Sequence, residues 1–150
     1  MVHKHMARAG KARLHLDRVH LARILIGMVT AWNLLAATTF ILWPADYVSA
    51  YELSGVPGET AVRGVGVLFL MWNIPYLVAL WHPVRYRLAL ILAVIMQLIG
   101  LVGEIFILAN LSSDHAVLRA SILRFIAFDT LGLILLLIAY WLVVTRRDAS

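Results

Sequence analysis

The chain has 150 residues, of which 63% are hydrophobic and 14% charged, and its formal net charge is +5. With a mean hydropathy of +0.89, it carries too little polar surface for a soluble domain, so we expect an integral membrane protein. The absence of cysteine excludes disulfides, thiol redox chemistry and iron–sulfur clusters.

Residues 1–20 form the first segment, MVHKHMARAGKARLHLDRVH, in which basic residues alternate irregularly with apolar ones. This pattern is typical of a basic cytoplasmic juxtamembrane arm that is attracted to anionic lipid. The aromatic residues that stack on bases in nucleic-acid-binding segments are absent from it. We therefore expect no nucleic-acid partner, in spite of the positive net charge.

Four apolar stretches follow the arm, and each is close to the roughly 20 residues that a helix needs to cross the hydrocarbon. They cover residues 21–43, 58–81, 88–110 and 117–144, and a short cytoplasmic tail, 145–150, ends the chain. The connection HPVRYR is long enough only for a tight turn, so the second and third helices are antiparallel neighbours. The sequence therefore predicts an all-α membrane protein, an antiparallel bundle of four transmembrane helices.

The longest connection, PADYVSAYELSGVPGET, lies between the first and second spans. Tyr47, Ala50, Tyr51 and Ser54 recur in it at helical spacing, which predicts a short helix lying along the membrane surface. Such a helix would cap any opening between the spans on its side. The second helix can begin early, because Pro57 follows a turn and is a good helix start.

Basic residues are distributed unevenly over the two sides of the predicted bundle. Of the 13 Lys and Arg residues, only Arg63, Arg119 and Arg124 fall on the side of the longest connection. Since loops rich in Lys and Arg stay in the cytoplasm, both termini are predicted to be cytoplasmic. The predicted location is the cell membrane, which the chain crosses several times.

Each span contains one polar residue near its middle: Asn33, Asn73, Gln97 and Asp129. At a rise of about 1.5 Å per residue, the four fall at similar depths. Amides and carboxyls that faced lipid would lack hydrogen-bond partners, so we expect a shared polar centre inside the bundle. Pro75 should kink the second helix close to Asn73.

Aromatic residues accompany two of these amides, in the pairs Trp32–Asn33 and Trp72–Asn73, and Tyr76 follows one turn after the second pair. In a ligand site the rings would form the walls and the amides would orient the ligand. The alternative is that the amides only join helices through hydrogen bonds, each contributing about 1 kcal/mol.

Glu104 and Arg124 lie at similar depths in the third and fourth spans, so their side chains can meet. A charge near the bilayer centre costs about 2.5–3.5 kcal/mol on insertion scales, and a hydrogen-bonded pair would offset most of it. Two interpretations remain open. The pair is a static clamp between two helices, or Arg124 neutralises an acidic head group or substrate in an outward-facing cavity.

Asp129 lies five residues from Arg124 on another face of the same helix, so the two do not pair easily. Burial without a basic neighbour favours the uncharged carboxyl. Asp129 is therefore a candidate proton donor or hydrogen-bonding group for a ligand, with Glu104 as the second acid–base residue. Alternatively, Asp129 only bonds to one of the midplane amides.

The stretch from Tyr51 to Glu104 resembles the DoxX-like superfamily of small four-helix membrane proteins. Its members commonly show a Gly-x-Pro turn, a glycine-rich second helix, a Pro/Arg inner turn and a third helix rich in small residues. The corresponding residues of the first three are Gly55–Pro57, Gly64 and Gly66, and Pro83, Arg85 and Arg87. The resemblance implies a fold more than a function. Some members are linked to quinone-coupled sulfur oxidation or redox stress, but without cysteine a thiol mechanism does not carry over.

Three classes of function remain open. The favoured one is a small membrane protein that binds a hydrophobic or amphiphilic molecule, lipid-like or quinone-like, in an intramembrane cavity. The second is an acid/base enzyme, an isomerase or hydrolase, acting on such a molecule. The third is a non-catalytic partner subunit of a membrane complex. Direct hydrogen bonds among the midplane groups would indicate that they only join helices, whereas a void lined by these groups would indicate a ligand site.

Metal chemistry is not expected, because no histidine lies in the middle of a span and no span carries the Glu-x-x-His pattern of di-iron bundles. No resident cofactor is predicted, although a quinone or a lipid would suit the polar centre. The expected partners are membrane lipid and a hydrophobic small molecule. A homo-oligomer remains an open alternative.

Overall fold

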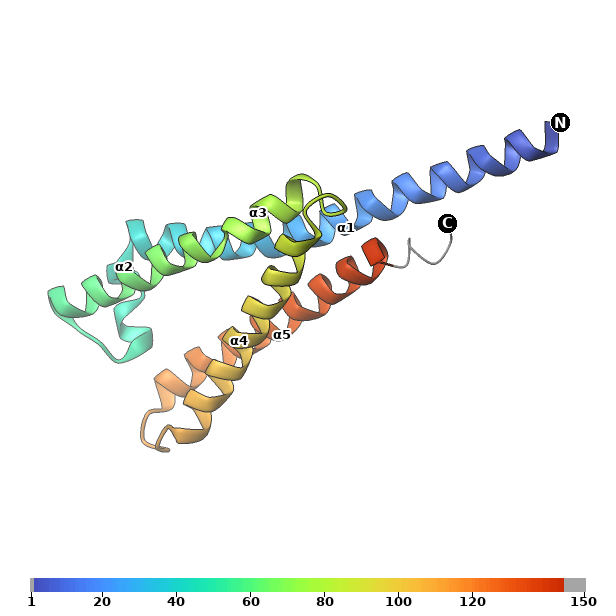
Figure 1. Ribbon diagram of the computed structural model, residues 1–150. Coiled ribbons are helices and arrows are strands. Elements are labelled where there is room, and N and C mark those ends of the chain that lie inside the picture. The colour runs from blue at the N-terminus through green and yellow to red at the C-terminus, as the bar shows by residue number, and fades with distance from the viewer. Residues whose placement is uncertain (1, 145–150) are drawn as a thin grey trace.

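The computed structural model describes the backbone of residues 2–144 and the side chains of residues 17–144. Its elements, in chain order, are α1 (Val2–Leu42), the 3₁₀ helices η1 (Pro44–Asp46) and η2 (Val48–Tyr51), α2 (Gly55–Trp72), α3 (Ile74–Trp81), α4 (Arg87–Asn110) and α5 (Ala116–Val144) (Figure 1). Helix α1 includes most of the predicted arm. The predicted tail, residues 145–150, lies outside the described residues.

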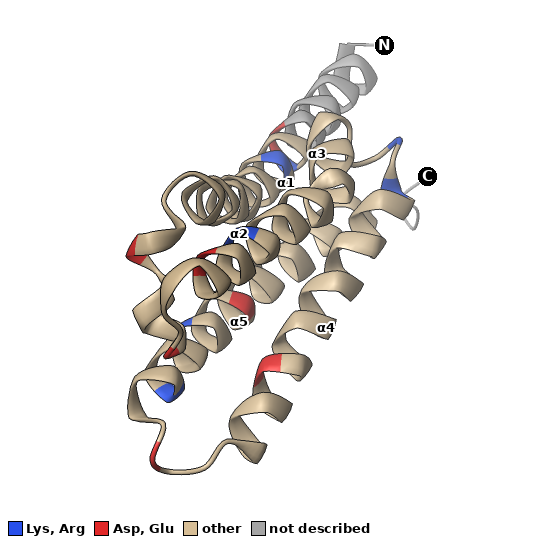
Figure 2. Cartoon of the chain, turned by 90° about the vertical axis from the view of Figure 1, so that its left-hand side faces the viewer, with Lys and Arg blue, Asp and Glu red and all other residues tan. Residues whose placement is uncertain are grey.

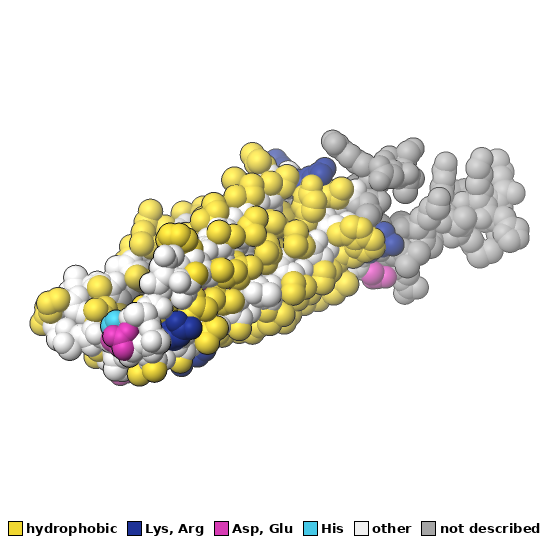
Figure 3. Space-filling model, turned by 90° about the horizontal axis from the view of Figure 1, so that it is seen from below, with side chains coloured by type: hydrophobic (Ala, Val, Ile, Leu, Met, Phe, Trp, Pro, Cys, Tyr) yellow, Lys and Arg dark blue, Asp and Glu magenta, His cyan; other side chains and the backbone are white. Residues whose placement is uncertain are grey.

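Four helical stretches are long and apolar enough to cross a membrane. They are Asp17–Leu42, Gly55–Trp81, Arg87–Asn110 and Ala116–Val144, the second being α2 and α3 together. Hydrophobic side chains cover most of the face between the two ends of the molecule, and the charged side chains on it gather near the ends (Figure 3). The predicted all-α, four-helix membrane fold is confirmed.

The second span is interrupted at Asn73, between α2 and α3. Pro75 stands in the first turn of α3 and has no N–H to donate, so the helix cannot continue unbroken through this point. The Asn73 N–H closes α2 by donating to the carbonyls of Phe69 and Leu70, at 3.1 and 3.2 Å. The second span is therefore interrupted where Pro75 was predicted to kink it, and Asn73 lies at the interruption.

The bundle is tightly packed at the end that carries the α3–α4 turn, His82–Tyr86, which we call the turn end. Alanines from α1, α3, α4 and α5 meet there without exposed surface: Ala22, Ala79, Ala93 and Ala139. Small residues let helix backbones approach closely, which is the main source of helix association in membranes. Larger side chains such as Ile26 and Leu136 complete this core.

Toward the opposite end the helices diverge. This loop end carries residues 43–54 and 111–115. Helices α1, α2 and α3 run together as one arm and α4 with α5 as another, and the two arms separate toward the loop end (Figure 1). Helix α3 packs on both α1 and α4, and α1 packs on both α2 and α5. The fold is thus closed at the turn end and spread at the loop end.

Three arginines cap helix C-termini by donating to backbone carbonyl oxygens: Arg23 to Leu80 (3.1 Å), Arg63 to Ile41 (3.2 Å) and Arg119 to Leu111 (3.2 Å). Cations are stabilising at this end of a helix because the last carbonyls lack intrahelical donors and carry partial negative charge. Two of the three basic residues predicted on the loop side therefore have a structural role.

The predicted surface helix of the longest connection is present as the two short 3₁₀ helices. Glu52 adopts a left-handed conformation, with φ of 55°, and this reversal ends η2 after one turn. The Glu52 side chain then reaches α5, where it contacts His115 Nδ1 (2.5 Å) and accepts from the Leu118 N–H (3.2 Å). The Ser121 hydroxyl donates to the carbonyl of Ala50 (2.7 Å). These contacts anchor the loop on the beginning of α5.

The Glu52–His115 contact predicts that loop anchoring depends on pH. The hydrogen bond with Glu52 raises the pKa of His115. The stability that this bond gives the folded protein is therefore complete below the ordinary histidine pKa of 6.5 and is lost as pH rises through the raised pKa. The same bond lowers the pKa of Glu52, so its contribution is lost only as pH falls below the ordinary value of 4.5 through the lowered pKa. The contact is strongest between these two values.

We expect the detergent-solubilised protein to unfold at a higher temperature at about pH 5.5 than at about pH 8.5, with a smaller difference in Glu52→Gln. Thermal unfolding of both proteins at both pH values measures this. Glu59→Gln, which removes a nearby carboxylate that makes no contact with His115, should keep the wild-type difference. An equal difference in wild type and Glu52→Gln would contradict the prediction.

Candidate functional site

A cavity of about 780 Å³ lies between the two arms, from the level of Tyr76 up to the loop. All five α-helices and both 3₁₀ helices contribute to its wall. The structure brings together there every residue that the sequence singled out: Trp32, Asn33, Trp72, Asn73, Tyr76, Gln97, Glu104, Arg124 and Asp129. Depth along the helix was the basis for grouping the polar residues, and the aromatic residues were added because they neighbour the amides in the sequence.

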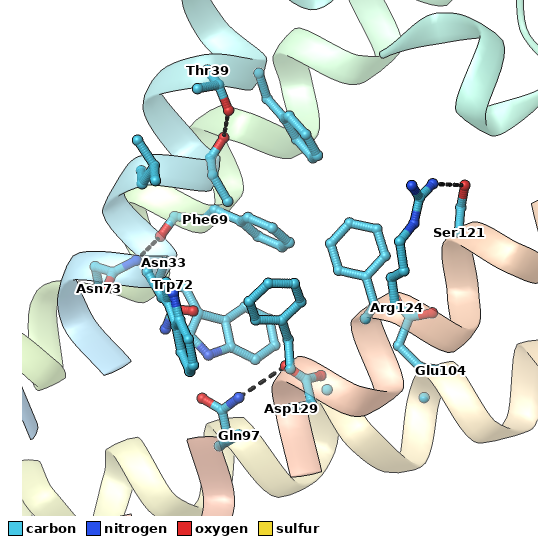
Figure 4. A pocket seen from close by; sticks show the side chains of 18 of the residues that line it. Asn33, Thr39, Phe69, Trp72, Asn73, Gln97, Glu104, Ser121, Arg124 and Asp129 are labelled. Atoms are coloured by element: carbon cyan, nitrogen blue, oxygen red, sulfur yellow. Dashed lines mark hydrogen bonds between the residues drawn. The ribbon is translucent and has the colours of Figure 1, made fainter. Parts of the chain in front are cut away.

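A hydrogen-bonded chain joins three of these residues across three helices. The Tyr76 hydroxyl donates to Gln97 Oε1 (2.7 Å). Gln97 Nε2 donates to Asp129 Oδ1 (2.8 Å), the bond drawn between these two residues in Figure 4. Tyr76 and Gln97 are buried, whereas Asp129 is half-buried and faces the cavity. This chain fixes the carboxyl of Asp129 at the wall while leaving part of it accessible.

Two glycines provide the space for this arrangement. A Cβ atom at Gly100 of α4 would lie 2.7 Å from Asp129 Oδ2, and a Cβ atom at Gly132 of α5 would lie 2.8 Å from Gln97 Nε2. Gly100 of α4 thus leaves room for the Asp129 side chain of α5, and Gly132 of α5 leaves room for the Gln97 side chain of α4. Gly100 is approached by a side chain and not by a neighbouring backbone, and a Cβ atom at Gly103 would meet nothing within 4 Å.

Asn73 is only partly satisfied at the helix break. Its side chain is 1% exposed, and Nδ2 donates to the Phe69 carbonyl (2.7 Å) (Figure 4). Its Oδ1 accepts no hydrogen bond from the described part of the chain. A buried acceptor without a donor costs about 1–3 kcal/mol. Asn33, half-buried on α1, lines the cavity without bonding to Asn73 or Asp129, so the midplane amides do not form one closed network.

The clamp considered for Glu104 and Arg124 is not formed. Among the described residues every ion pair within 4 Å involves His115, and none joins these two side chains. Arg124 turns toward the loop instead, where its Nη2 donates to Ser121 Oγ (2.8 Å) (Figure 4). Ser121 also donates to the carbonyl of Ala50. The Arg124 guanidinium therefore lies near the loop and does not bind Glu104 on α4. Both charged groups face the cavity.

Aromatic rings form much of the remaining wall, and most of them were not predicted. Phe40 of α1, Phe69 of α2 and Phe125 of α5 lie with ring centroids 6.0–6.4 Å apart, and Tyr51 of η2 joins them at 6.1–6.3 Å. The three phenylalanines do not stand out from the apolar runs that contain them. The Tyr47–Tyr51 spacing was the signal that the loop covers this end.

The cavity opens sideways between the helices. Leu35, Ile99 and Phe128 line it and are 63%, 58% and 50% exposed. Trp32 lies at the same rim, with its ring edge-on to Phe128 at a centroid distance of 5.2 Å. Since these residues lie within membrane-crossing stretches, the opening is at the level of the hydrocarbon. Within residues 17–144, no group of three or more His, Asp or Glu side chains is placed to hold a metal ion.

Comparison of the chain with protein-family models, with curated proteins and with solved structures finds no significant match.

Proposed function

We propose that this integral membrane protein binds an amphiphilic small molecule, lipid-like or quinone-like, in the cavity between its helices. The cavity itself is the observation that carries the proposal. Its volume of about 780 Å³ is within the range of small-molecule sites, roughly 300–1,000 Å³, and its wall combines many apolar rings with few polar groups, as such sites do. Helix association alone would account for the Tyr76–Gln97–Asp129 chain but not for an open space beside it.

The groups around the cavity suggest how such a molecule would lie. Its apolar part would pack on Trp72 and Phe69 and reach the hydrocarbon through the rim at Trp32. A hydroxyl or N–H group on the molecule would find acceptors in Asp129 and, after a small rotation of the carboxamide, in Asn73. Because the opening is lateral, a molecule dissolved in the bilayer could enter without crossing water.

The bias of basic residues supports the cell membrane as the location, with the loop end outside and both termini in the cytoplasm. Membership of the DoxX-like superfamily is part of the same proposal, since the turn and glycine pattern that suggests it also fits a small four-helix protein. Assembly into a homo-oligomer or with a partner subunit is compatible with the exposed apolar faces of the helices.

Acid/base catalysis on the bound molecule is a second candidate. Asp129 and Glu104 line the same cavity from neighbouring helices, so both carboxyl groups can reach one bound molecule. The Asp129→Asn variant separates the two functions. An enzyme would lose turnover while keeping most of its affinity, because the amide retains shape and hydrogen bonding but cannot transfer a proton.

Native mass spectrometry of the detergent-purified protein, followed by extraction of the bound molecule, tests the proposal. We expect one amphiphile per chain in the wild type and loss of most of it in Asp129→Ala and Asn73→Ala, because each change removes a polar contact worth about 1–3 kcal/mol. Thr38→Ala, which removes an exposed hydroxyl of α1 outside the cavity, should retain the molecule.

One outcome would contradict the proposed ligand binding. If no molecule accompanies the wild type and none of a series of added amphiphiles binds, while Asp129→Ala lowers only the unfolding temperature, then the polar centre serves helix association and the proposal fails.

A further inference from the structure

We infer that the head group bound at the loop end of the cavity is zwitterionic, with its cation beside Glu104 and its anion beside Arg124. This inference rests on the proposed function, to which it adds the chemical class of the ligand. It follows from the arrangement of the charged side chains, which face one cavity from the neighbouring helices α4 and α5 without pairing with each other.

Glu104 is the only acidic residue of α4 and lies between the ends of that helix (Figure 2). It is half-buried and lines the cavity. Among the described residues, no hydrogen-bond donor or cation is bound to its carboxyl group, in contrast to Asp129, which accepts from Gln97. A carboxylate inside a membrane protein without a partner is costly. We therefore expect a cation or a strong hydrogen-bond donor of a ligand to bind Glu104.

Arg124 is the complementary group. The other two arginines of the loop end, Arg63 and Arg119, cap helix carbonyls, whereas the guanidinium of Arg124 has a single bond, to the Ser121 hydroxyl. A guanidinium has five N–H donors in a planar fork that suits a phosphate or carboxylate. Most of these donors are therefore unused where Arg124 meets the cavity.

Tyr51 shows that the two charges share one region. Burial and the Glu104 carboxylate raise the pKa of the Tyr51 hydroxyl, and the Arg124 guanidinium acts on it in the opposite direction. Its ring also packs against Phe125, with centroids 6.3 Å apart. Tyr51, Glu104 and Arg124 thus line the same part of the cavity.

The remaining charged groups of the wall do not alter this picture. Asp129 lies deeper and is bonded to Gln97, and Asp46 is exposed on η1 at the edge of the cavity. An anionic ligand would satisfy Arg124 but be repelled by Glu104, and a cationic ligand would do the reverse. A zwitterion satisfies both and brings no net charge into the membrane. Phosphoethanolamine has this chemistry, as the head group of a lipid or as a free compound.

The test compares four probes by native mass spectrometry in a non-ionic detergent. Three share one chain length: a lysophosphatidylethanolamine, a lysophosphatidylglycerol and an alkylammonium. The fourth is free phosphoethanolamine, added as a competitor. We expect the wild type to prefer the zwitterionic amphiphile by about tenfold or more over the anionic and the cationic amphiphile, since each unmet charge loses a charge-assisted contact.

Variants reverse the preference if the assignment is correct. Glu104→Gln should favour the anionic amphiphile and Arg124→Gln the cationic one, whereas Arg119→Gln, which removes the same charge from the same helix outside the cavity, should keep the wild-type order. These comparisons are made within each purified variant, so differences in stability do not enter. Competition by free phosphoethanolamine assigns the site to a soluble zwitterion, and its absence assigns it to a lipid; either result supports the zwitterionic head group.

Equal binding of all three amphiphiles in the wild type would overturn this inference and leave the proposed function standing. So would a preference that Glu104→Gln and Arg124→Gln leave unchanged. Failure of every probe to bind would count against the proposed function as well.

Discussion

Replacing Gly66 with alanine is expected to destabilise the protein more than any other single methyl group added in the bundle. A Cβ atom there would lie 2.9 Å from the carbonyl oxygen of Ala37, from Phe40 Cβ and from Ile41 Cγ1. The carbonyl oxygen and Phe40 Cβ are fixed by the α1 backbone, so α1 and α2 must separate. Overpacking of this kind costs about 1–3 kcal/mol. Thermal unfolding in detergent should show a clearly lower midpoint.

Gly64→Ala is the matched control. It lies two residues away on the same helix, and a Cβ atom there meets nothing within 4 Å. Since alanine is intrinsically better than glycine inside a helix by about 0.5–1 kcal/mol, this variant should be as stable as wild type or slightly more so. Equal unfolding temperatures for Gly64→Ala and Gly66→Ala would show that α1 and α2 do not meet at Gly66.

Replacing Gly100 with alanine is expected to impair the cavity rather than the fold. The new methyl group would lie 2.7 Å from Asp129 Oδ2 and would displace that carboxyl from its position on Gln97. Once displaced, the carboxyl would no longer meet a ligand that binds to Asp129. The loss of one such polar contact corresponds to roughly a tenfold or greater loss of affinity. Occupancy by the co-purified or added amphiphile, measured by native mass spectrometry, reports this change.

Gly103→Ala tests the specificity of that effect. Gly103 lies on the same helix and lines the same cavity, but a Cβ atom there has no neighbour within 4 Å. We expect it to bind the amphiphile nearly as well as wild type. If both variants lose the amphiphile equally, then the cavity responds to any added volume and Asp129 has no particular role.

The sequence was sufficient for the architecture because membrane helices are specified by length and apolar content. Pro75 located the break in the second span, since proline lacks the N–H that the helix needs there. The spacing of Tyr47 and Tyr51 indicated a helical loop element, but not that the left-handed Glu52 would shorten it to single 3₁₀ turns. The side chain of Glu52 contacts His115, 63 residues away in the chain, and the local spacing does not reveal such a contact.

The candidate site could be predicted only as a set of residues at matching depths. Depth grouped Asn73, Gln97 and Asp129 correctly on the cavity wall, but it says nothing about how far apart two helices stand. The two arms lie close together at the turn end, where alanines stand between the helices, and apart toward the loop end, where phenylalanines stand between them. For the same reason depth allowed Glu104 and Arg124 to meet, whereas Arg124 donates to Ser121 on its own helix.

The position of a photoreactive amphiphile on the protein is the most direct test of ligand binding inside the bundle. A single-chain lipid with a diazirine in its chain would be activated on the purified protein, and the labelled residues mapped by peptide mass spectrometry. Helix α4 offers an internal comparison, because its cavity face carries Met96, Gly100 and Gly103, whereas Val102 and Phe106 point outward and are 57% and 69% exposed.

We predict that label gathers on the cavity face of α4 and on Trp72, and that an excess of the unlabelled lipid abolishes it there while leaving diffuse label on the outward residues. Label spread evenly around α4, with no displacement by the unlabelled lipid, would contradict a binding site between the helices.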